Sequence, residues 1–462
     1  MPEDSNLISA AAPRPAELIS ARIERLPFTR FHARILSVVG SASFFDGFDS
    51  LTIAYVLPVL VGLWALSNEQ VGLLISIGYV GQLIGAIAFT WAAERVGRLR
   101  ALRWTIAVTA ILSAACALAW SYSALLMFRA VQGLGLGGEV PLGATYINEF
   151  TSAKIRGRVV FSLQFIYATG LLITAYVAAL VVPAFGWTSM FIIGTVPILI
   201  AIWLPRLAPE SPRWLAGHGK VEAAAQILST IEQSFLKSSM QPLPPLASNI
   251  QKISKAGGSI RNLFEGIYKS RTLSVWTCMF CYSTISTAMA TWLPTIYRTV
   301  YHLSLNNALY YSLSIYTAQL VGAIIGINLI DRIGRRSIIL TCFIGGALPI
   351  LFLGLGPTPT SPTYVMILVT IGYLFLGCII QALYVYAPEI YPTRVRALGA
   401  GVATSWLRIA TIISPTIVGF ILSHFNVTGA FLYFGGIGLV GALVTYFFVI
   451  ETKGRILEEL SP

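Results

Sequence analysis

The sequence predicts an all-α membrane protein of twelve transmembrane helices, arranged as two pseudo-symmetric six-helix bundles. Three observations lead to this fold class. The chain of 462 residues is 56% apolar and only 11% charged, whereas soluble domains are about 25% charged. It contains twelve apolar segments long enough to cross a bilayer, for which about 20 residues suffice. Two short motifs recur in the same order half a chain apart, which indicates a duplicated unit.

The duplication is visible in polar motifs. Glu94–Arg98 recurs as Asp331–Arg335 at an offset of 237 residues. A second motif recurs at an offset of 240 with the same internal spacing, as Tyr146, Glu149 and Arg156 in the first half and Tyr386, Glu389 and Arg396 in the second.

The predicted spans are helices, because no alternating strand pattern occurs and a bilayer tolerates no open sheet edge. Six precede a long hydrophilic connection and six follow it. They lie near 35–62, 70–93, 100–120, 123–149, 157–183, 187–206, 271–299, 307–330, 336–356, 362–388, 396–423 and 427–450.

The net charge of +12 is explained by topology. Of the 31 basic residues, 28 fall in the termini and in connections that lie on one side of the predicted membrane. The positive-inside rule then places both termini and the central connection in the cytoplasm. The location that we expect for this multi-pass protein is the cell membrane, as a bacterial inner-membrane protein. The basic charge therefore gives no reason to expect a nucleic-acid partner.

The chain divides into five predicted parts. A cytoplasmic segment, 1–34, precedes the N-terminal bundle, 35–206. A cytoplasmic linker, 207–270, connects it to the C-terminal bundle, 271–450, and a tail covers 451–462. Residues 1–34 have no apolar core and are not expected to be a signal peptide. Within the linker, residues 221–235 have the apolar periodicity of a short amphipathic helix.

No cofactor or metal is predicted. The five cysteines all fall inside predicted spans, and Cys278 with Cys281 forms a single C-x-x-C. One such pair without a second is a weak metal signal, so we interpret it as helix packing. No nucleophile–base constellation stands out, so we expect no enzyme activity.

Several motifs together resemble the major facilitator superfamily over essentially the whole chain. Residues 94–98 are similar to its Asp-Arg-x-Gly-Arg motif with Glu94 in place of Asp, and residues 331–336 match that motif without substitution. The run from Arg129 through Gly133, Gly135 and Gly137 resembles the fourth helix of its sugar-porter and organic-ion branches. Pro209–Leu215 and Glu451–Gly454 are of the same type.

The branch most similar to this chain is the metabolite:proton symporter group, which includes aromatic-acid and niacin carriers and synaptic-vesicle-like proteins. Asp46–Asp49 resembles the paired-aspartate motif of aromatic-acid:proton symporters. Thr284–Trp292 lacks the double glutamine typical of sugar porters, although Gln164 with Gly170 resembles their fifth helix. The resemblance implies transport by alternating access.

Two carboxylates lie on one face of the first span, because Asp46 and Asp49 are three residues apart. An ionisable group at membrane depth is functional by default. Mutual repulsion and burial both favour the protonated form, so the pair is suited to taking up and releasing a proton.

Arg129 in the fourth span is the expected partner of this pair. The resemblance implies that Asp49 and Arg129 are the proton-coupling aspartate and its arginine partner, paired when Asp49 is ionised and released when it is protonated. A static buried ion pair is the alternative.

Glu139 lies in the same span at about the depth of Asp46. It is a candidate second proton site or substrate contact, and a packing acid beside a glycine-rich crossing is the alternative.

Arg408 lies near the midplane of the eleventh span, about 12 residues or roughly 18 Å from its start. The C-terminal half offers no midplane carboxylate, so we expect this guanidinium to bind a substrate carboxylate. The competing interpretation pairs it with Glu139 or Asp46 across the cavity. Uncharged candidates for orienting a polar or aromatic ligand are Gln164, Tyr282, Gln381 and Tyr384.

Two clusters of charged residues are predicted to form a cytoplasmic gate. They would hold the halves together while the protein is open outward and separate when the cytoplasmic side opens. One consists of Glu94, Arg95, Arg98, Glu149 and Arg156, and the other of Asp331, Arg332, Arg335, Glu389 and Arg396.

The function expected from the sequence is proton-coupled import of a small organic anion, with an aromatic or related carboxylate as the substrate class. The partners are the substrate, protons and the bilayer, and a monomer is expected. No Walker motif points to ATP. A sugar or polyol symporter, an organic-cation or drug carrier, and a transporter-like sensor remain alternatives; the linker is short for the output domain of a sensor.

Overall fold

The computed structural model describes residues 15–239, 242–245, 260–356, 361–392 and 395–453, which are almost entirely helical. The first bundle follows a short N-terminal helix, α1 (Pro15–Glu24). Its long helices and the split sixth segment are α2 (Arg30–Trp64), α3 (Asn68–Val96), α4 (Arg98–Ala117), α5 (Tyr122–Asn148), α6 (Ala153–Phe185), α7 (Thr188–Ile193) and α8 (Pro197–Leu207).

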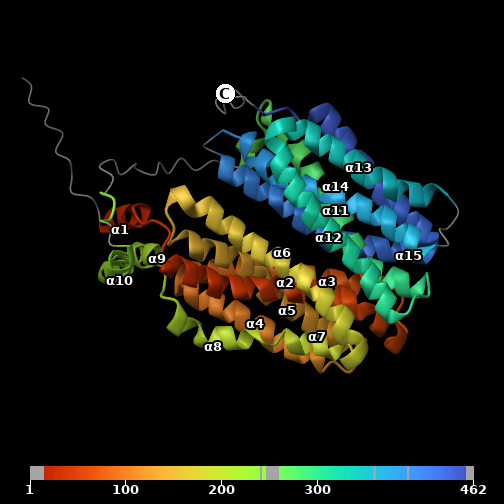
Figure 1. The fold of residues 1–462 in the computed structure, drawn as a ribbon, viewed down its shortest axis with the longest axis horizontal. Coiled ribbons are helices and arrows are strands. Elements are labelled where there is room, and N and C mark those ends of the chain that lie inside the picture. Colours follow the sequence, from red (N-terminus) through yellow and green to blue (C-terminus); the bar gives the residue numbers. More distant parts are fainter. Residues whose placement is uncertain (1–14, 240–241, 246–259, 357–360, 393–394, 454–462) are drawn as a thin grey trace, which may run out of the picture.

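The connection between bundles carries α9 (Pro212–Gly217), α10 (Val221–Ser239) and a 3-10 turn, Ile260–Phe264. The second bundle contains α11 (Tyr268–Thr299), α12 (Leu305–Ile333), α13 (Arg335–Leu355), α14 (Pro362–Glu389) and α15 (Arg396–Phe448). Figure 1 shows the bundles side by side, with α1, α9 and α10 beyond one end of the first.

All twelve predicted spans correspond to helical segments. Nine helices in the described ranges are long and apolar enough to cross a membrane. The last contains two predicted spans, which meet where Asn426 has a φ of 61° and interrupts the helix. The other two predicted spans are α5 and α11, which fall outside this set and carry polar groups such as Arg129 and Thr284 along their length.

Local chemistry sets several helix starts. Ser67, Ser121, Ser304 and Ser361 precede α3, α5, α12 and α14, and each hydroxyl accepts a hydrogen bond from the backbone N–H three residues later. These contacts satisfy one of the N–H groups that a helix leaves unpaired at its start.

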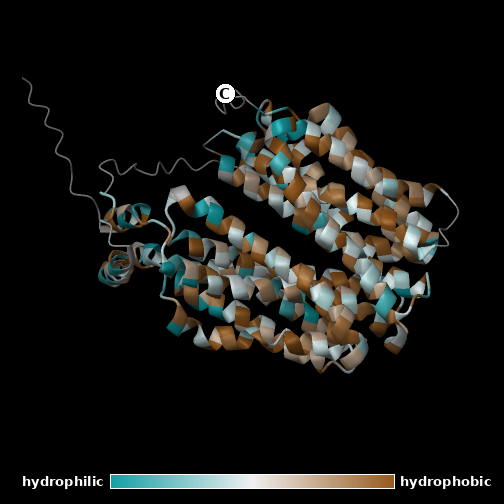
Figure 2. Ribbon diagram, in the orientation of Figure 1, coloured by the Kyte–Doolittle hydropathy of each residue, from teal (hydrophilic) through white to brown (hydrophobic). Residues whose placement is uncertain are grey.

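One end of the molecule carries α1, α9, α10 and the basic helix starts at Arg98 and Arg335; we call it the basic end, and the opposite end the far end. Figure 2 shows that hydrophilic residues gather toward the basic end, whereas the long helices are largely hydrophobic. The amphipathic helix predicted in the linker is confirmed as α10. Its buried Leu228 and Ile231 belong to the same apolar cluster as Ile19 and Ile23 of α1.

The bundles meet closely at the far end. The backbone of α3 contacts that of α15, because a Cβ added at Gly72 would lie 2.7 Å from the carbonyl oxygen of Pro415. Nearby, the hydroxyls of Ser76 and Thr416 lie 2.8 Å apart and join the bundles. At the basic end, no ion pair between described residues crosses from one bundle to the other. The structure is therefore closed at the far end.

Candidate functional site

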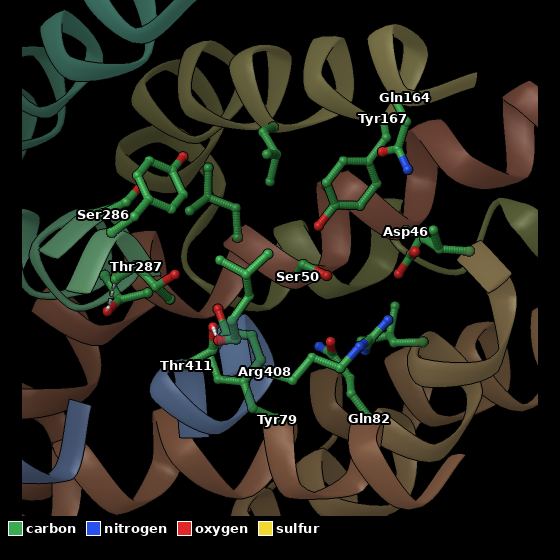
Figure 3. Close-up of a pocket in the computed structure, with 18 of the residues that line it drawn as sticks. Asp46, Ser50, Tyr79, Gln82, Gln164, Tyr167, Ser286, Thr287, Arg408 and Thr411 are labelled. Atoms are coloured by element: carbon green, nitrogen blue, oxygen red, sulfur yellow. Dashed lines mark hydrogen bonds between the residues drawn. The ribbon is translucent and has the colours of Figure 1, made fainter. Parts of the chain in front are cut away.

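A cavity of about 530 Å³ lies between the bundles and receives side chains from both. Figure 3 shows its polar residues converging from helices of the two halves. The side chains with polar groups that line it are Asp46, Ser50, Tyr79, Gln82, Gln164, Tyr167, Tyr282, Ser286, Thr287, Thr291, Tyr316, Gln319, Tyr384, Thr404, Arg408 and Thr411. Its size is that of small-molecule sites.

Arg408 of α15 is the cation of this cavity. Its side chain reaches across the cavity in Figure 3, on the side where Asp46 and Gln82 are drawn. No ion pair or hydrogen bond joins the guanidinium to another described residue, so Asp46 interacts with it only at longer range. The competing pairing with Glu139 or Asp46 is thus not made in this conformation.

Only some of the uncharged residues predicted to contact the substrate line the cavity. Gln164, Tyr282 and Tyr384 line the cavity, but Gln381 is absent from its lining. The Tyr282 hydroxyl accepts a hydrogen bond of 3.1 Å from the Gln319 amide, which also donates to Ser286 at 3.4 Å. The placement of Gln381 in the cavity is therefore wrong for this conformation: α14 presents Tyr384, almost one turn later, instead.

Sequence reasoning missed several lining residues, chiefly Tyr79, Gln82, Tyr167, Tyr316 and Gln319. All are polar or amphipathic side chains within apolar spans. That property is the only sequence signal that could have identified them as lining residues. Helices in a bundle are covered on most faces, so periodicity does not tell which face meets the cavity.

The carboxylates of α2 have different environments. Asp46 is 3% exposed and lines the cavity, whereas Asp49 is fully buried behind it. Glu139 of α5 is also buried and lies in the electrostatic range of both, with no hydrogen bond to another described residue. Three acids therefore lie together near one end of the cavity.

The direct ion pair between Asp49 and Arg129, predicted for the ionised state of Asp49, is not made in this conformation. Arg129 donates a hydrogen bond of 2.8 Å to the side-chain oxygen Oε1 of Gln132. The side-chain nitrogen Nε2 of Gln132 donates to the Ser113 hydroxyl at 3.1 Å. That hydroxyl donates to Asp49 Oδ1 at 3.1 Å. A directed chain of hydrogen bonds, the relay Arg129–Gln132–Ser113–Asp49, takes the place of the pair. Gln132 and Ser113 were not singled out from the sequence.

The first predicted gate cluster is only partly assembled. Arg98 pairs with Glu94 at 2.8 Å and with Glu149 at 3.0 Å. Arg95 is exposed and lies over the Trp91 ring, at 3.7 Å from its centroid. Arg156 contacts Glu24 of α1 at 3.4 Å and not Glu149. Arg95 and Arg156 therefore do not contact these acids in this conformation, and their grouping in the outward-open state stays a prediction.

The second cluster is similarly reduced. Arg335 makes a bidentate contact with Glu389, at 3.2 and 3.1 Å. Arg396 donates to the Tyr391 carbonyl oxygen, and the guanidinium of exposed Arg332 has no ion pair with a described residue. The side chain of Asp331 lies outside the described part of the chain.

One glutamate from another motif completes each cluster. Glu210 accepts from the backbone N–H of Leu99 at the start of α4, and Glu451 accepts from those of Arg335 and Arg336 at the start of α13. The preceding glycines, Gly97 and Gly334, have φ angles of 110° and 101°, which other residues rarely adopt. The two halves thus repeat one arrangement, in which a carboxylate caps a helix N-terminus. Their roles as caps were missed, since nothing local links them to residues more than 100 positions away.

Burial of Glu451 would raise the pKa of its carboxyl group. Hydrogen bonds from the backbone N–H groups of Lys453, Arg335, Arg336 and Thr452 outweigh burial and lower this pKa below its ordinary value. Glu451 is therefore ionised in the folded protein near neutral pH.

The family described as "Sugar (and other) transporter" matches residues 33–462. The chain belongs to this family of the major facilitator superfamily. The transporter is 32% identical to the niacin transporter NiaP of Acinetobacter baylyi over 456 residues, covering 96% of this chain and 99% of the relative. It is 29% identical to the inner membrane metabolite transport protein YdjE of Escherichia coli, covering 96% and 98%.

Solved structures agree with the fold. The transporter matches the partially occluded inward-open xylose transporter XylE of Escherichia coli with a TM-score of 0.72 at 20% identity, covering 93% of this chain and 100% of that one. A bacterial homolog of the human lysosomal transporter Spinster, in an inward-facing conformation, matches with a TM-score of 0.71 at 13% identity, covering 91% and 97%. The predicted resemblance and the twelve-helix fold are both confirmed.

Proposed function

We propose that this transporter imports a small organic anion, an aromatic or related carboxylate, together with protons. The observation that carries the proposal is Arg408, a cavity-lining guanidinium without an ion pair among the described residues. A guanidinium is costly at membrane depth unless a partner approaches it, and a carboxylate can bind it bidentately.

The remainder of the cavity suits a ligand with an aromatic ring. Tyr79, Tyr167, Tyr282, Tyr316 and Tyr384 contribute to its walls. Aromatic side chains offer both an apolar face for stacking and a hydroxyl for a polar substituent. A similar protein is named as a niacin transporter, which makes nicotinate the first ligand to test.

We assign proton coupling to the acids in and behind the cavity wall. Asp46 meets the cavity, while Asp49 is buried and linked to Arg129 by the relay. A proton on Asp49 changes the charge that Arg129 experiences, and this change biases the position of α2 relative to α5. Glu139 is a second proton site on the same wall.

The basic end faces the cytoplasm of a bacterial cell in this proposal, following the positive-inside rule. The described conformation is then closed to the outside at Ser76 and Thr416 and open toward the cytoplasm. Arg98 with Glu94 and Glu149, and Arg335 with Glu389, stay inside their own bundles in this state and contact across the halves in the outward-open one.

A second candidate is a sugar or polyol carried with protons. The amides of Gln164 and Gln319 and the hydroxyls of Ser50, Ser286 and Thr411 line the same cavity. Such groups suit a ligand rich in hydroxyls.

The test is a thermal-shift panel on purified protein with nicotinate, benzoate, succinate, xylose and choline, followed by uptake into liposomes with an imposed pH gradient. Stabilisation by nicotinate or benzoate and acid-driven accumulation are expected. Stabilisation by xylose alone would favour the second candidate, and flux that ignores the gradient would contradict proton coupling.

A further inference from the structure

The relay behind the cavity contains two complementary unpaired atoms. Asp49 Oδ2 and Arg129 Nε are both buried, and neither has a hydrogen-bond partner among the described residues. One is an acceptor, or a hydroxyl when protonated, and the other is a donor. Asp49 is 0% exposed, Arg129 2% and Gln132 0%, so water does not substitute freely for missing partners.

Gln132 occupies the position that an ionised Asp49 would compete for. It lies three residues after Arg129 on α5, and its carbonyl oxygen accepts from the guanidinium at 2.8 Å. Its amide nitrogen donates to Ser113, which donates to Asp49. All three donors point toward the carboxyl group, so the chain is oriented and Gln132 connects the two charged residues.

The enclosure is tight. A Cβ added at Gly194, between α7 and α8, would collide with Asp49 Oδ1 and Ser113 Oγ. One added at Gly78 of α3 would lie 3.2 Å from a terminal nitrogen of Arg129. Backbone from two further segments therefore encloses the relay, which leaves Arg129 few partners to choose from.

We propose that Gln132 is a positioning residue that holds Arg129 while Asp49 is protonated and yields it to Asp49 when the proton leaves. This inference rests on the proton-coupled transport proposed above. A buried guanidinium without a partner is strongly unfavourable, and a neutral amide can pair with it without competing strongly with a carboxylate. Direct contact between Arg129 Nε and Asp49 Oδ2 in the ionised state would satisfy both unpaired atoms.

Other charged and titratable groups near Asp49 also influence its protonation. They are Asp46 on α2, Glu139 on α5 and Cys116 on α4, whose thiol lies 3.8 Å from the Gln132 carbonyl oxygen. From α6, Tyr167 faces Asp46. These groups are the same in each variant below, so a difference between a variant and the wild type is due to the substituted residue.

The test measures exchange of radiolabelled nicotinate in proteoliposomes at equal internal and external pH, over a range of pH values. Gln132→Leu leaves Arg129 only Asp49 as a partner, which favours the ionised carboxylate. The midpoint of the pH profile is expected to fall by about 1 unit or more. Gln132→Glu gives Arg129 a permanent anionic partner beside Asp49, so the midpoint is expected to rise by about 1 unit and acid-driven accumulation to be lost.

A merely structural role for Gln132 would reduce activity in both variants without moving the midpoints in opposite directions. Ser113→Ala is a second test that keeps the Gln132 side chain but removes the hydroxyl between it and Asp49. Asp49 loses one donor, and the midpoint is expected to rise. Thr445→Val, which removes a buried hydroxyl from α15 in the other bundle, is the control and should keep the wild-type midpoint.

The outcomes separate the two proposals. If wild-type flux depends on pH and the Gln132 variants keep the wild-type midpoint, the transfer of Arg129 from Gln132 to Asp49 is refuted and proton coupling stands. Wild-type flux that does not depend on pH would overturn both. Thermal unfolding of each purified variant verifies folding, and if Gln132→Leu does not fold, the isosteric Gln132→Glu and Ser113→Ala decide.

Discussion

The hydroxyl oxygens of Ser76 and Thr416 lie 2.8 Å apart and join the two bundles at the far end. Glu69 of α3 and Ser423 of α15 also interact between the halves at this end. Beside these contacts, Gly72 and Gly419 allow the backbones of α3 and α15 to touch. The far end must separate for alternating access, so the contact between Ser76 and Thr416 is a natural point at which to lock the transporter.

The double variant Ser76→Cys with Thr416→Cys is expected to form a disulfide under mild oxidation, because the side-chain atoms that the two sulfurs replace already lie 2.8 Å apart. Transport should stop on oxidation and return with a reducing agent. Uptake before and after reduction is the measurement. Each single cysteine variant serves as the control. An oxidised double variant that transports at the wild-type rate would refute the view that the far end must open during transport.

Arg408→Ala is expected to weaken binding of nicotinate or the carboxylate that the panel selects by about 10- to 100-fold, the value of a hydrogen bond to a charged group. Titration calorimetry on purified protein measures the Kd. Arg298→Ala is the matched control, since Arg298 donates to the Leu303 carbonyl oxygen away from the cavity. Unchanged affinity in Arg408→Ala would move the substrate class toward sugars or cations.

Arg335→Ala is expected to lower the free energy of unfolding by about 1–3 kcal/mol, because it leaves the partly buried Glu389 without its bidentate partner. Arg332→Ala removes an exposed arginine of the same motif and should cost no more than about 0.5 kcal/mol. Thermal unfolding in detergent compares the two. Equal losses would show that position within the motif, and not the contact with Glu389, sets stability.

Glu451→Gln tests the helix cap through its pH dependence. The folded protein lowers the pKa of Glu451, so the stabilisation is complete above the ordinary value of about 4.3 and is lost as the pH falls through the folded value. The variant should be less stable at pH 7, by about 1 kcal/mol after allowance for solvent screening. Its difference from wild type should shrink below about pH 4. A difference that is constant over this range would argue against the ionised cap.

Much of the fold followed from the sequence because the bilayer imposes a simple rule on length and apolarity. Segment 271–299 was found although its polar residues weaken the hydropathy signal. The two spans of α15 were also separated correctly, because the helix is interrupted at a kink where Asn426 has a non-helical backbone. The amphipathic helix α10 followed from periodicity alone.

The site was less predictable. Asp46, Asp49 and Arg129 stood out because charges at membrane depth are rare, and Arg408 for the same reason. Gln132 and Ser113 carry no charge, and their importance arises from contacts between α4 and α5 that spacing does not encode. Gln381 was placed wrongly because its helix is covered by neighbours on several faces, so a polar residue gives no direction. Arg95 and Arg156 have other partners in this conformation, because motif membership does not determine which group an arginine reaches in each state.

The central claim is that protons move with the substrate through Asp49. Accumulation of radiolabelled nicotinate in proteoliposomes with an acidic exterior, compared between wild type and Asp49→Asn, tests it most directly. The account predicts that the variant loses accumulation against a gradient and keeps exchange between internal and external substrate. Accumulation at the wild-type level in Asp49→Asn would contradict it.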